Sequence, residues 1–245
     1  MSESGAGDPG FGSPHHRHRR TDSTNLRARE LAEAGAPSGT VVTAEEQSSG
    51  RGRAGRVWSA PAGEALLYSA ILRPLDLSHL MRPLAVPLAV CEACEAVAPV
   101  RCMLKWPNDI WLDERKLAGV LIEARGSDWA VIGVGVNLSI APESFPADLR
   151  WPATSLGHGV SPETMRPALD AALSRWVAAA PDLVQAEFSR RDVLQDREIH
   201  WEGGPSGDGR SGVGAGIDER GNLLVRGAGG ELSALGSGEV SLRVG

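Results

Sequence analysis

Residues 101–138 read RCMLKWPNDIWLDERKLAGVLIEARGSDWAVIGVGVNL, a series of short apolar runs separated by turn-forming residues. The connections contain Pro, Asn, Asp, Gly and Ser, which favour tight turns between strands. The stretch therefore predicts strands paired as antiparallel hairpins, at Arg101–Lys105, Ile110–Leu112, Lys116–Arg125 and Trp129–Leu138.

The residues before this stretch predict a helix, two strands and an apolar helical region. N-cap residue types at Asp22–Asn25 precede apolar residues at helical spacing, and Gly35 then ends the helix. Strands are expected at Thr40–Ala44 and Ala65–Leu72. The helical region is Leu77–Val97, in which Pro83 and Pro87 are expected to break or kink the first half.

The residues after it change character near Arg197. Two helices are expected first, one opened by the N-cap Ser161 and followed by Pro162, and a second at Asp182–Arg191. Beyond them Gly and Ser become dense, and short strands alternate with turn signals, as in a small β-barrel. These strands are expected at Arg197–Trp201, Gly212–Ile217, Asn222–Arg226 and Val240–Val244.

The predicted fold class is therefore α+β, with two ordered parts. A mixed α/β domain is expected at residues 21–194 and a small β-domain at residues 195–245. Residues 1–20 are small, polar and without periodicity, which predicts a disordered tail. The tail has no room for a helix-turn-helix, so no DNA-binding role is expected.

Composition and cysteine usage restrict the function classes. A net charge of −6 argues against a general nucleic-acid binder. The sequence has no signal peptide and no apolar run of membrane-spanning length, so a cytoplasmic protein without membrane contact is expected. Cys91, Cys94 and Cys102 lack a second ligand pair at zinc spacing. They are expected to be core residues in a reducing compartment.

A glycine- and arginine-rich loop, Gln47–Trp58 (the Gly/Arg loop), stands out in this acidic chain. Its glycines let backbone N–H groups turn toward an anion, and its guanidiniums match carboxylate and phosphate. Two interpretations remain open, a solvated basic loop and an anion-binding loop. The alternating residues are Gly50, Arg51, Gly52, Arg53, Gly55 and Arg56.

Known phosphate-binding loops do not fit this segment. Gly50-x-Gly52-x-x-Gly55 has the spacing of a dinucleotide fingerprint, but the residues that follow cannot start a helix. No Gly-Lys-Ser/Thr follows, so it is not a Walker loop, and a kinase-type catalytic loop is not evident downstream. A mobile loop that folds around a phosphate-bearing ligand remains.

Three further groups of residues are candidates for chemistry. Ser23, Thr24 and Asn25 either cap a helix or bind a small polar ligand at its N-terminus. Asp109 and Lys116 could meet across a hairpin, as an exposed ion pair or as part of a site that stabilises charge on phosphate oxygens. In Gly133-x-Gly135-x-Asn137, the glycines indicate close approach of a ligand, another backbone or a helix.

Taken together, these segments resemble the biotin protein ligases of the monofunctional type. The resemblance covers nearly the whole chain and rests on six segments in the same order. They are Asp22–Asn25, Gln47 with Gly50–Trp58, Lys105–Asp109, Lys116–Glu123, Gly133–Asn137 and Gly238–Arg243.

The resemblance implies a catalytic domain of the biotin/lipoate ligase type followed by an SH3-like barrel. It also implies two reactions. Biotin and ATP, with Mg²⁺, first form biotinyl-5′-AMP, and biotin then passes to a lysine of a biotin carboxyl carrier domain. Mg²⁺ is expected to arrive with ATP and not at a fixed protein site. A monomer or weak homodimer is expected.

The resemblance also implies the site residues. The catalytic residues implied are Lys116, Arg51, Arg53 and Asp109. Biotin binding is implied for Ser23, Thr24, Asn25, Gln47, Arg51, Gly52, Arg53 and Lys116. ATP or adenylate binding is implied for Gly50, Arg51, Arg53, Arg56, Trp58, Asn108, Lys116, Asn137, Glu239 and Arg243. The alternatives are a lipoate protein ligase, which shares the fold and the adenylate chemistry, and a non-catalytic biotin or adenylate sensor.

Overall fold

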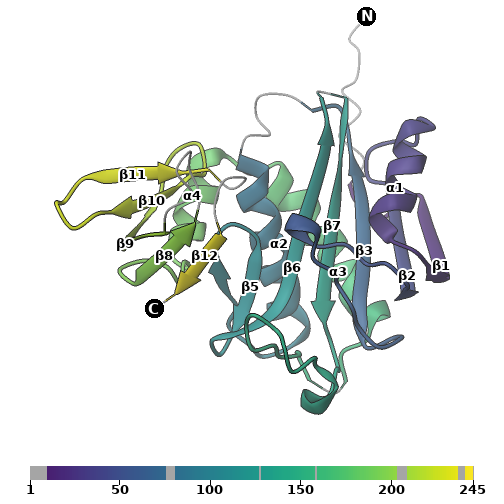
Figure 1. Cartoon of the computed structure of the whole chain (residues 1–245). Coiled ribbons are helices and arrows are strands. Elements are labelled where there is room, and N and C mark those ends of the chain that lie inside the picture. The colour runs from purple at the N-terminus through teal and green to yellow at the C-terminus, as the bar shows by residue number, and fades with distance from the viewer. Residues whose placement is uncertain are drawn as a thin grey trace, which may run out of the picture.

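The computed structural model describes residues 10–75, 81–126, 128–157, 159–202, 209–236 and 241–244. A seven-stranded sheet with the order β1-β2-β3-β7-β6-β5-β4 forms its larger part (Figure 1). The strands are β1 (His15–Thr21), β2 (Val41–Gln47), β3 (Ala65–Leu72), β4 (Met103–Lys105), β5 (Asp109–Leu112), β6 (Arg115–Arg125) and β7 (Trp129–Asn137).

The antiparallel hairpins predicted for residues 101–138 are confirmed. β4, β5, β6 and β7 pair with one another in sequence order, and every one of these pairs is antiparallel. β7 also pairs with β3 from Ala130 to Asn137, where Ala65 lies opposite Asn137. The two strands β3 and β7 are therefore held on both sides, and side chains on them have fixed positions.

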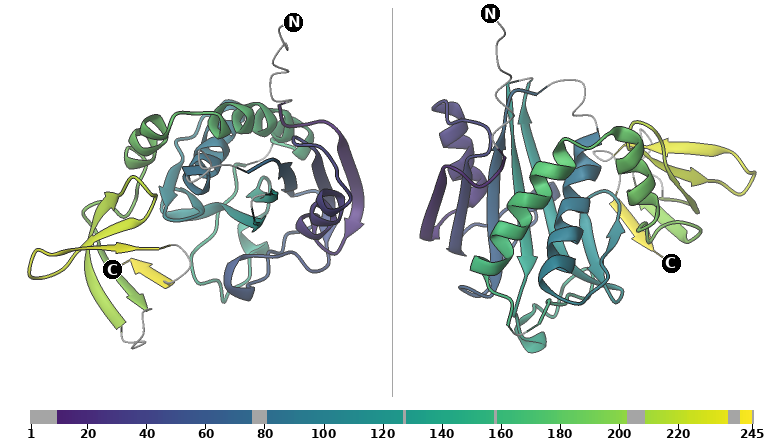
Figure 2. Two further views of the ribbon diagram at one scale, coloured as in Figure 1. Left: turned by 90° about the horizontal axis from the view of Figure 1, so that it is seen from above. Right: turned by 180° about the vertical axis from the view of Figure 1, so that it is seen from behind.

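The two faces of the sheet have different coverings. α2 (Arg82–Val97) and α3 (Pro162–Val177) pack on one face, with α4 (Pro181–Ser189) against α2, while α1 (Thr24–Glu33) lies on the other (Figure 2). Because side chains alternate along a strand, Leu66 and Tyr68 enter the core beneath α2 and α3. Leu67 and Ser69 point to the opposite face, beside α1.

The helix α2 corrects the expectation that Pro83 and Pro87 interrupt the helical region. The helix begins at Arg82, so Pro83 lies in its first turn, where no intrahelical N–H bond is lost. The helix then continues through Pro87 to Val97. Residues 77–80 of the expected helix lie outside the described residues. Cys91 and Cys94 on this helix, and Cys102, are buried free thiols of the core, as predicted.

The structure corrects the predicted disordered tail for the residues it describes. His15–Thr21 form β1, an edge strand that pairs in parallel with β2. Most of its side chains are exposed, so the segment has no apolar pattern from which a strand could be predicted. Arg17 and Arg20 instead form ion pairs with Glu45 and Glu46 of β2.

The C-terminal part is a five-stranded sheet with the order β11-β10-β9-β8-β12. A small antiparallel β-domain is thus confirmed, although β11 was not predicted. Its strands are β8 (Glu198–Glu202), β9 (Gly209–Ile217), β10 (Leu223–Arg226), β11 (Leu232–Leu235) and β12 (Ser241–Val244). The buried Trp106 joins the two sheets, because its indole N–H donates to the Gly221 carbonyl at 2.9 Å.

Asp192, between α4 and β8, is buried with one carboxylate oxygen lacking a hydrogen-bond partner among the described residues. Its other oxygen accepts from the Leu194 N–H. Burial raises the pKa of Asp192 to about 6, although the Leu194 bond opposes that change. The folded state therefore binds the proton of the Asp192 carboxyl more tightly than the unfolded chain does. The stability that this proton binding contributes is present below about pH 4 and is lost as the pH rises through 6.

Above that pH the buried carboxyl must ionise, which lowers the free energy of unfolding of the wild type by on the order of 2–3 kcal/mol. We expect Asp192→Asn to remove this loss, because an amide does not ionise. The melting temperature of the variant minus that of the wild type should be more positive at pH 8 than at pH 5. Asp196→Asn, at an exposed carboxyl four residues away, is the matched control. A Tm difference that is equal at the two pH values would contradict this account of Asp192.

Candidate functional site

A cavity of about 230 Å³ opens on the face of the sheet opposite α2 and α3. The start of α1, the Gly/Arg loop, β6, β7 and the segment 145–153 line it. It brings together most of the residues implied by the resemblance. Those that line it are Ser23, Thr24, Asn25, Gln47, Arg51, Gly52, Arg53, Arg56, Trp58, Asn108, Lys116 and Asn137.

Four of the predicted site residues are not among the lining residues. Gly50 lies within the loop against its other end, where a Cβ would lie 2.2 Å from the Trp58 carbonyl oxygen. Asp109 reaches the cavity through its contact with Lys116. Glu239 lies outside the described residues, as does the side chain of Arg243 on β12. The predicted roles of Glu239 and Arg243 therefore stay predictions.

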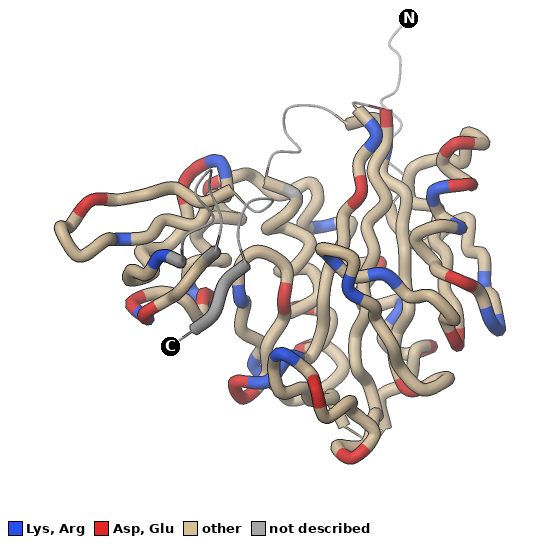
Figure 3. The backbone as a smooth tube through the Cα atoms, viewed as in Figure 1, with Lys and Arg blue, Asp and Glu red and all other residues tan. Residues whose placement is uncertain are grey.

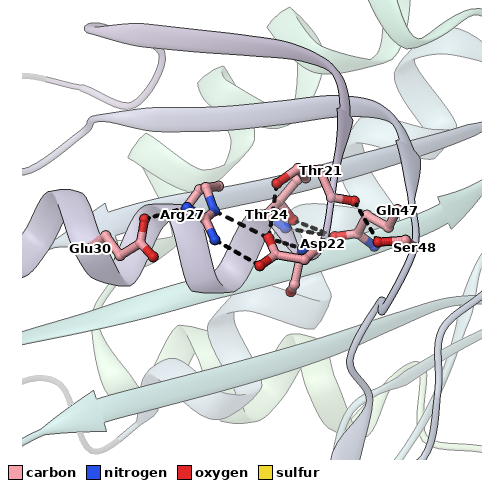
Figure 4. Close-up of polar contacts among 8 residues, drawn as sticks. Thr21, Asp22, Thr24, Arg27, Glu30, Gln47 and Ser48 are labelled. Atoms are coloured by element: carbon pink, nitrogen blue, oxygen red, sulfur yellow. Dashed lines mark hydrogen bonds and ion pairs between the residues drawn. The ribbon is translucent and has the colours of Figure 1, made fainter.

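The polar residues at the start of α1 form a buried network. Ser23 is the N-cap residue, but its side chain makes no capping hydrogen bond. The N–H of Thr24 donates to Gln47 Oε1 at 2.7 Å, and its hydroxyl donates to the same oxygen (Figure 4). Asp22 accepts from Arg27, and this bond is the main reason that the pKa of Asp22 falls to about 2. A carboxylate that stays charged thus stabilises the helix start.

Asn25 extends this network toward the Gly/Arg loop. Its Oδ1 accepts from the Ser69 hydroxyl at 2.6 Å, and its Nδ2 donates to Glu123 at 2.9 Å. Glu123 also forms an ion pair with Arg51 at 3.1 Å. Ser69 and Glu123 were not among the predicted site residues, because their contacts join segments that are far apart in the chain.

The glycines of β7 give room to two side chains of the site. A Cβ on Gly133 would lie 2.1 Å from Asn25 Oδ1, and a Cβ on Gly135 would lie 2.4 Å from the Trp58 ring. The close approach predicted from the sequence is therefore made by side chains from α1 and the Gly/Arg loop. Asn137 follows on the same face, and its amide donates to the Thr154 carbonyl.

The Gly/Arg loop folds back on itself over the strands (Figure 3). A bridge between Arg51 and Val57 closes it, and a short 3₁₀ turn, Arg53–Gly55, forms its tip. No helix follows, in agreement with the rejection of the dinucleotide fingerprint. Arg53 donates to Asn108 at 3.5 Å, and burial lowers the pKa of Arg53 despite the opposing charge of Asp109.

Asp109 and Lys116 meet across the β5–β6 hairpin, as predicted. Their carboxylate and ammonium lie 2.7 Å apart, and both side chains are largely buried. This distinguishes the pair from an ordinary exposed ion pair, which contributes little. The Lys116 ammonium also lies 5.8 Å from the centre of the Trp58 ring. Lys116 thus stands between a carboxylate and an aromatic wall of the cavity.

The segment 145–153 completes the cavity and was not predicted to do so. Its Leu149, Arg150 and Trp151 line the cavity. It is fixed to β6 because the Lys116 N–H donates to the Pro152 carbonyl, and Ala153 forms a bridge with Lys116. The sequence feature that could have indicated this segment is Trp151, a large aromatic residue in a polar loop. Its presence alone does not predict which cavity the side chain faces.

Comparison with known proteins then shows the family. The chain is 37% identical to a biotin–[acetyl-CoA-carboxylase] ligase of Paracoccus denitrificans, over 86% of this chain and 93% of that protein. The chain belongs to the biotin protein ligase family. A Mycobacterium tuberculosis ligase of the same name is 35% identical over 90% of this chain and 86% of that protein.

Other matches agree with this family. The Biotin/lipoate A/B protein ligase family matches residues 18–137, and the Biotin protein ligase C terminal domain matches residues 211–243. The biotin protein ligase from Aquifex aeolicus, solved with biotin and ATP, superposes with a TM-score of 0.82 at 27% identity, covering 96% of this chain and 100% of that one. The predicted resemblance and fold class are thereby confirmed.

Some family members are longer than this chain. The bifunctional ligase/repressor BirA of Bacillus subtilis is 38% identical over 58% of this chain, but the match spans 45% of that protein. The chain thus spans less than half the length of this relative. Among the described residues of this biotin protein ligase family member, no helix is long and apolar enough to cross a membrane. The described residues also contain no cluster of three metal-ligating side chains.

Proposed function

We propose that the protein is an ATP-dependent biotin protein ligase. The observation that carries this proposal is one cavity that joins a polar network at Ser23–Asn25 to the cations of Arg51, Arg53 and Lys116. In the first step, a biotin carboxylate oxygen attacks the α-phosphorus of ATP, and the bond to the β-phosphate oxygen breaks. Biotinyl-5′-AMP forms, and pyrophosphate leaves together with Mg²⁺.

In the second step, a carrier lysine amine attacks the acyl carbon of the adenylate. The C–O bond to the phosphate breaks, AMP leaves, and the amine loses a proton as the amide forms. The carrier is a biotin carboxyl carrier protein or domain. In the structure, the Asp109 carboxylate pairs with Lys116. Asp109 is our candidate to orient or deprotonate the incoming amine.

The biotin end of the proposed site is the network around Asn25. Biotin's ureido ring is planar and offers both donors and acceptors, which suits the hydroxyls and amides of Ser23, Thr24 and Asn25 with Gln47 beside them. Hydrogen-bonding sites of this kind discriminate strongly against a ligand without matching groups. Leu67, Gly133 and Gly135 form an apolar part of the cavity lining next to this network. This apolar surface suits the rest of the biotin ring system.

The reacting end is the cluster of cations. In this proposal Lys116 bridges the biotin carboxylate and the α-phosphate, where its charge stabilises the transition state. Arg51 and Arg53 offset the charge of the same groups, and Arg56 adds charge at the loop tip. Trp58 and Trp151 offer flat faces for the adenine base. Gly50 allows the close approach of the loop to the Trp58 backbone, Asn108 accepts a hydrogen bond from Arg53, and Asn137 lines the cavity. For Glu239 and Arg243, nucleotide binding is proposed from the family resemblance alone.

A transfer assay tests this function and its two alternatives. Labelled biotin or lipoate is incubated with the protein, MgATP and a carrier domain, with ATP omitted as control. Labelling of the carrier lysine by biotin and not by lipoate supports the proposal. Preferential labelling by lipoate would identify a lipoate ligase, and binding of biotin without ATP-dependent labelling would identify a sensor.

The Gly/Arg loop carries a separate prediction about closure. We expect residues 48–62 to become ordered over biotinyl-AMP, because their guanidiniums then have an anion to surround, and to exclude water from the reactive anhydride. Limited proteolysis with a protease that cleaves after arginine should show slower cleavage of this loop when the adenylate is bound. Equal cleavage with and without the adenylate would contradict the closure.

We further propose a cytoplasmic location and a monomer or weak homodimer. Three free buried thiols suit a reducing compartment. The net charge of −6 supports a protein without general DNA or membrane binding. The proposed domain boundary near residue 195 falls between the end of α4 and the start of β8.

A further inference from the structure

Lys105, the last residue of β4, is a buried cation that the proposed chemistry does not use. Among the residues whose side-chain burial the structure describes, it is the only Lys or Arg that is buried, with 5% of its surface exposed. The described residues place no carboxylate within ion-pair distance of its ammonium. Instead, Nζ lies 4.7 Å from the ring centre of Trp151 and 5.9 Å from that of Trp111.

Such a position is costly for a lysine and needs an explanation. Buried lysines are usually paired with a carboxylate, because removing an ammonium from water costs several kcal/mol. The electron-rich face of an indole offsets part of this cost. The chain has only two lysines among its 25 Lys and Arg residues, and both, Lys105 and Lys116, lie at this site.

The position of Trp151 shows what Lys105 can act upon. Trp151 lines the cavity, whereas Lys105 does not. The Trp151 ring is tilted by 60° against Trp111, with ring centres 5.5 Å apart. Lys105 and Trp111 therefore support one wall of the cavity from outside. The neighbouring residues of that wall are fixed to β6 through Lys116.

We propose that Lys105 is a positioning residue whose ammonium holds the Trp151 indole in place as a wall of the adenylate site. This inference rests on the proposed function, because the ligand that Trp151 meets is the adenylate. Lys105 touches no substrate in this proposal. Its effect passes through Trp151 alone.

The electrostatics of Lys105 add a pH dependence. Burial lowers the pKa of Lys105 to about 8, and the nearby charges of Arg150, Lys116 and Arg56 lower it further, while Asp109 opposes them. The ammonium is thus mostly charged at pH 7 and mostly neutral at pH 9. A neutral amine loses its attraction to the indole face, so adenylate affinity should fall as the pH rises through 8.

The test measures binding of a biotinyl-adenylate analogue in which a stable ester replaces the reactive anhydride. At pH 7 we expect Lys105→Met to bind this analogue about 10-fold more weakly than the wild type, as for loss of a desolvated cation–π contact. Lys105→Arg keeps a charge and should bind like the wild type at both pH 7 and pH 9. The wild type should lose affinity at pH 9, and biotin alone should bind equally to all three.

A double-mutant cycle with Trp151→Leu separates positioning from direct contact. If Lys105 acts through Trp151, Lys105→Met adds little in the Trp151→Leu background. If the two losses multiply, Lys105 contacts the ligand itself and the positioning role is overturned. Arg175→Met is the matched control, since Arg175 lies 5.5 Å over Trp176 and neither residue lines the cavity.

The failures of the two proposals are distinguishable. If the wild type does not bind the analogue, the proposed ligase function fails. If the wild type binds it and Lys105→Met binds it equally well, only the role of Lys105 fails. Melting curves of each variant show whether a loss of affinity comes with a loss of fold.

Discussion

Lys116→Ala should abolish formation of biotinyl-AMP while the protein stays folded. The Lys116 side chain lines the cavity, and its ammonium lies 2.7 Å from Asp109. In the proposed reaction, charge develops beside it on the carboxylate and α-phosphate oxygens. Loss of one such preorganised group costs about 10²–10³-fold in rate in well-studied sites. Pyrophosphate release with biotin and MgATP measures this step directly.

Arg115→Ala is the matched control for Lys116→Ala. Arg115 precedes Lys116 on β6, but its side chain is exposed. Its replacement should leave pyrophosphate release unchanged. Near-normal release by Lys116→Ala, in a variant that melts cooperatively, would remove Lys116 from its proposed role. Loss of both release and cooperative melting would call for Lys116→Met, which keeps the apolar stem of the side chain.

Gly133→Ala should weaken biotin binding by about 100-fold, because it displaces Asn25 and breaks two hydrogen bonds of its side chain, one buried and one partly buried. The added Cβ would lie 2.1 Å from Asn25 Oδ1, closer than real contacts allow. β7 cannot move away, since it pairs with β3 and β6 along its length. The Asn25 side chain must then move and lose its hydrogen bonds with Ser69 and Glu123. Titration calorimetry with biotin measures the loss.

The double variant with Asn25→Ala tests the reason for this loss. Asn25→Ala removes the three atoms that the new Cβ would meet. In that background, Gly133→Ala should therefore cause little further change in biotin affinity. If Gly133→Ala binds biotin like the wild type, or if its effect persists in full without the Asn25 side chain, the proposed clash is not the cause.

Local patterns in the sequence were sufficient to predict most of the sheet and helices. Turn residues between apolar runs predicted the β4–β7 hairpins, and the N-cap Ser161 with Pro162 predicted the start of α3. The edge strand β1 was missed because its exposed side chains carry no apolar periodicity. Its pairing with β2 depends on backbone bonds and ion pairs that no local pattern records.

For the site, the order of motifs in the sequence was enough to indicate the family and twelve of the residues that line the cavity. Residue types at fixed spacing carry that information, because a glycine-rich basic loop or a Pro-Asn-Asp turn is local. Tertiary structure alone decided how they meet. It showed that Glu123 joins Asn25 to Arg51, that the β7 glycines leave space for Asn25 and Trp58, and that the Lys105 ammonium lies over the Trp151 ring. Each of these contacts joins segments far apart in the chain, and only the pairing of strands and the pleat of the sheet bring them to one face.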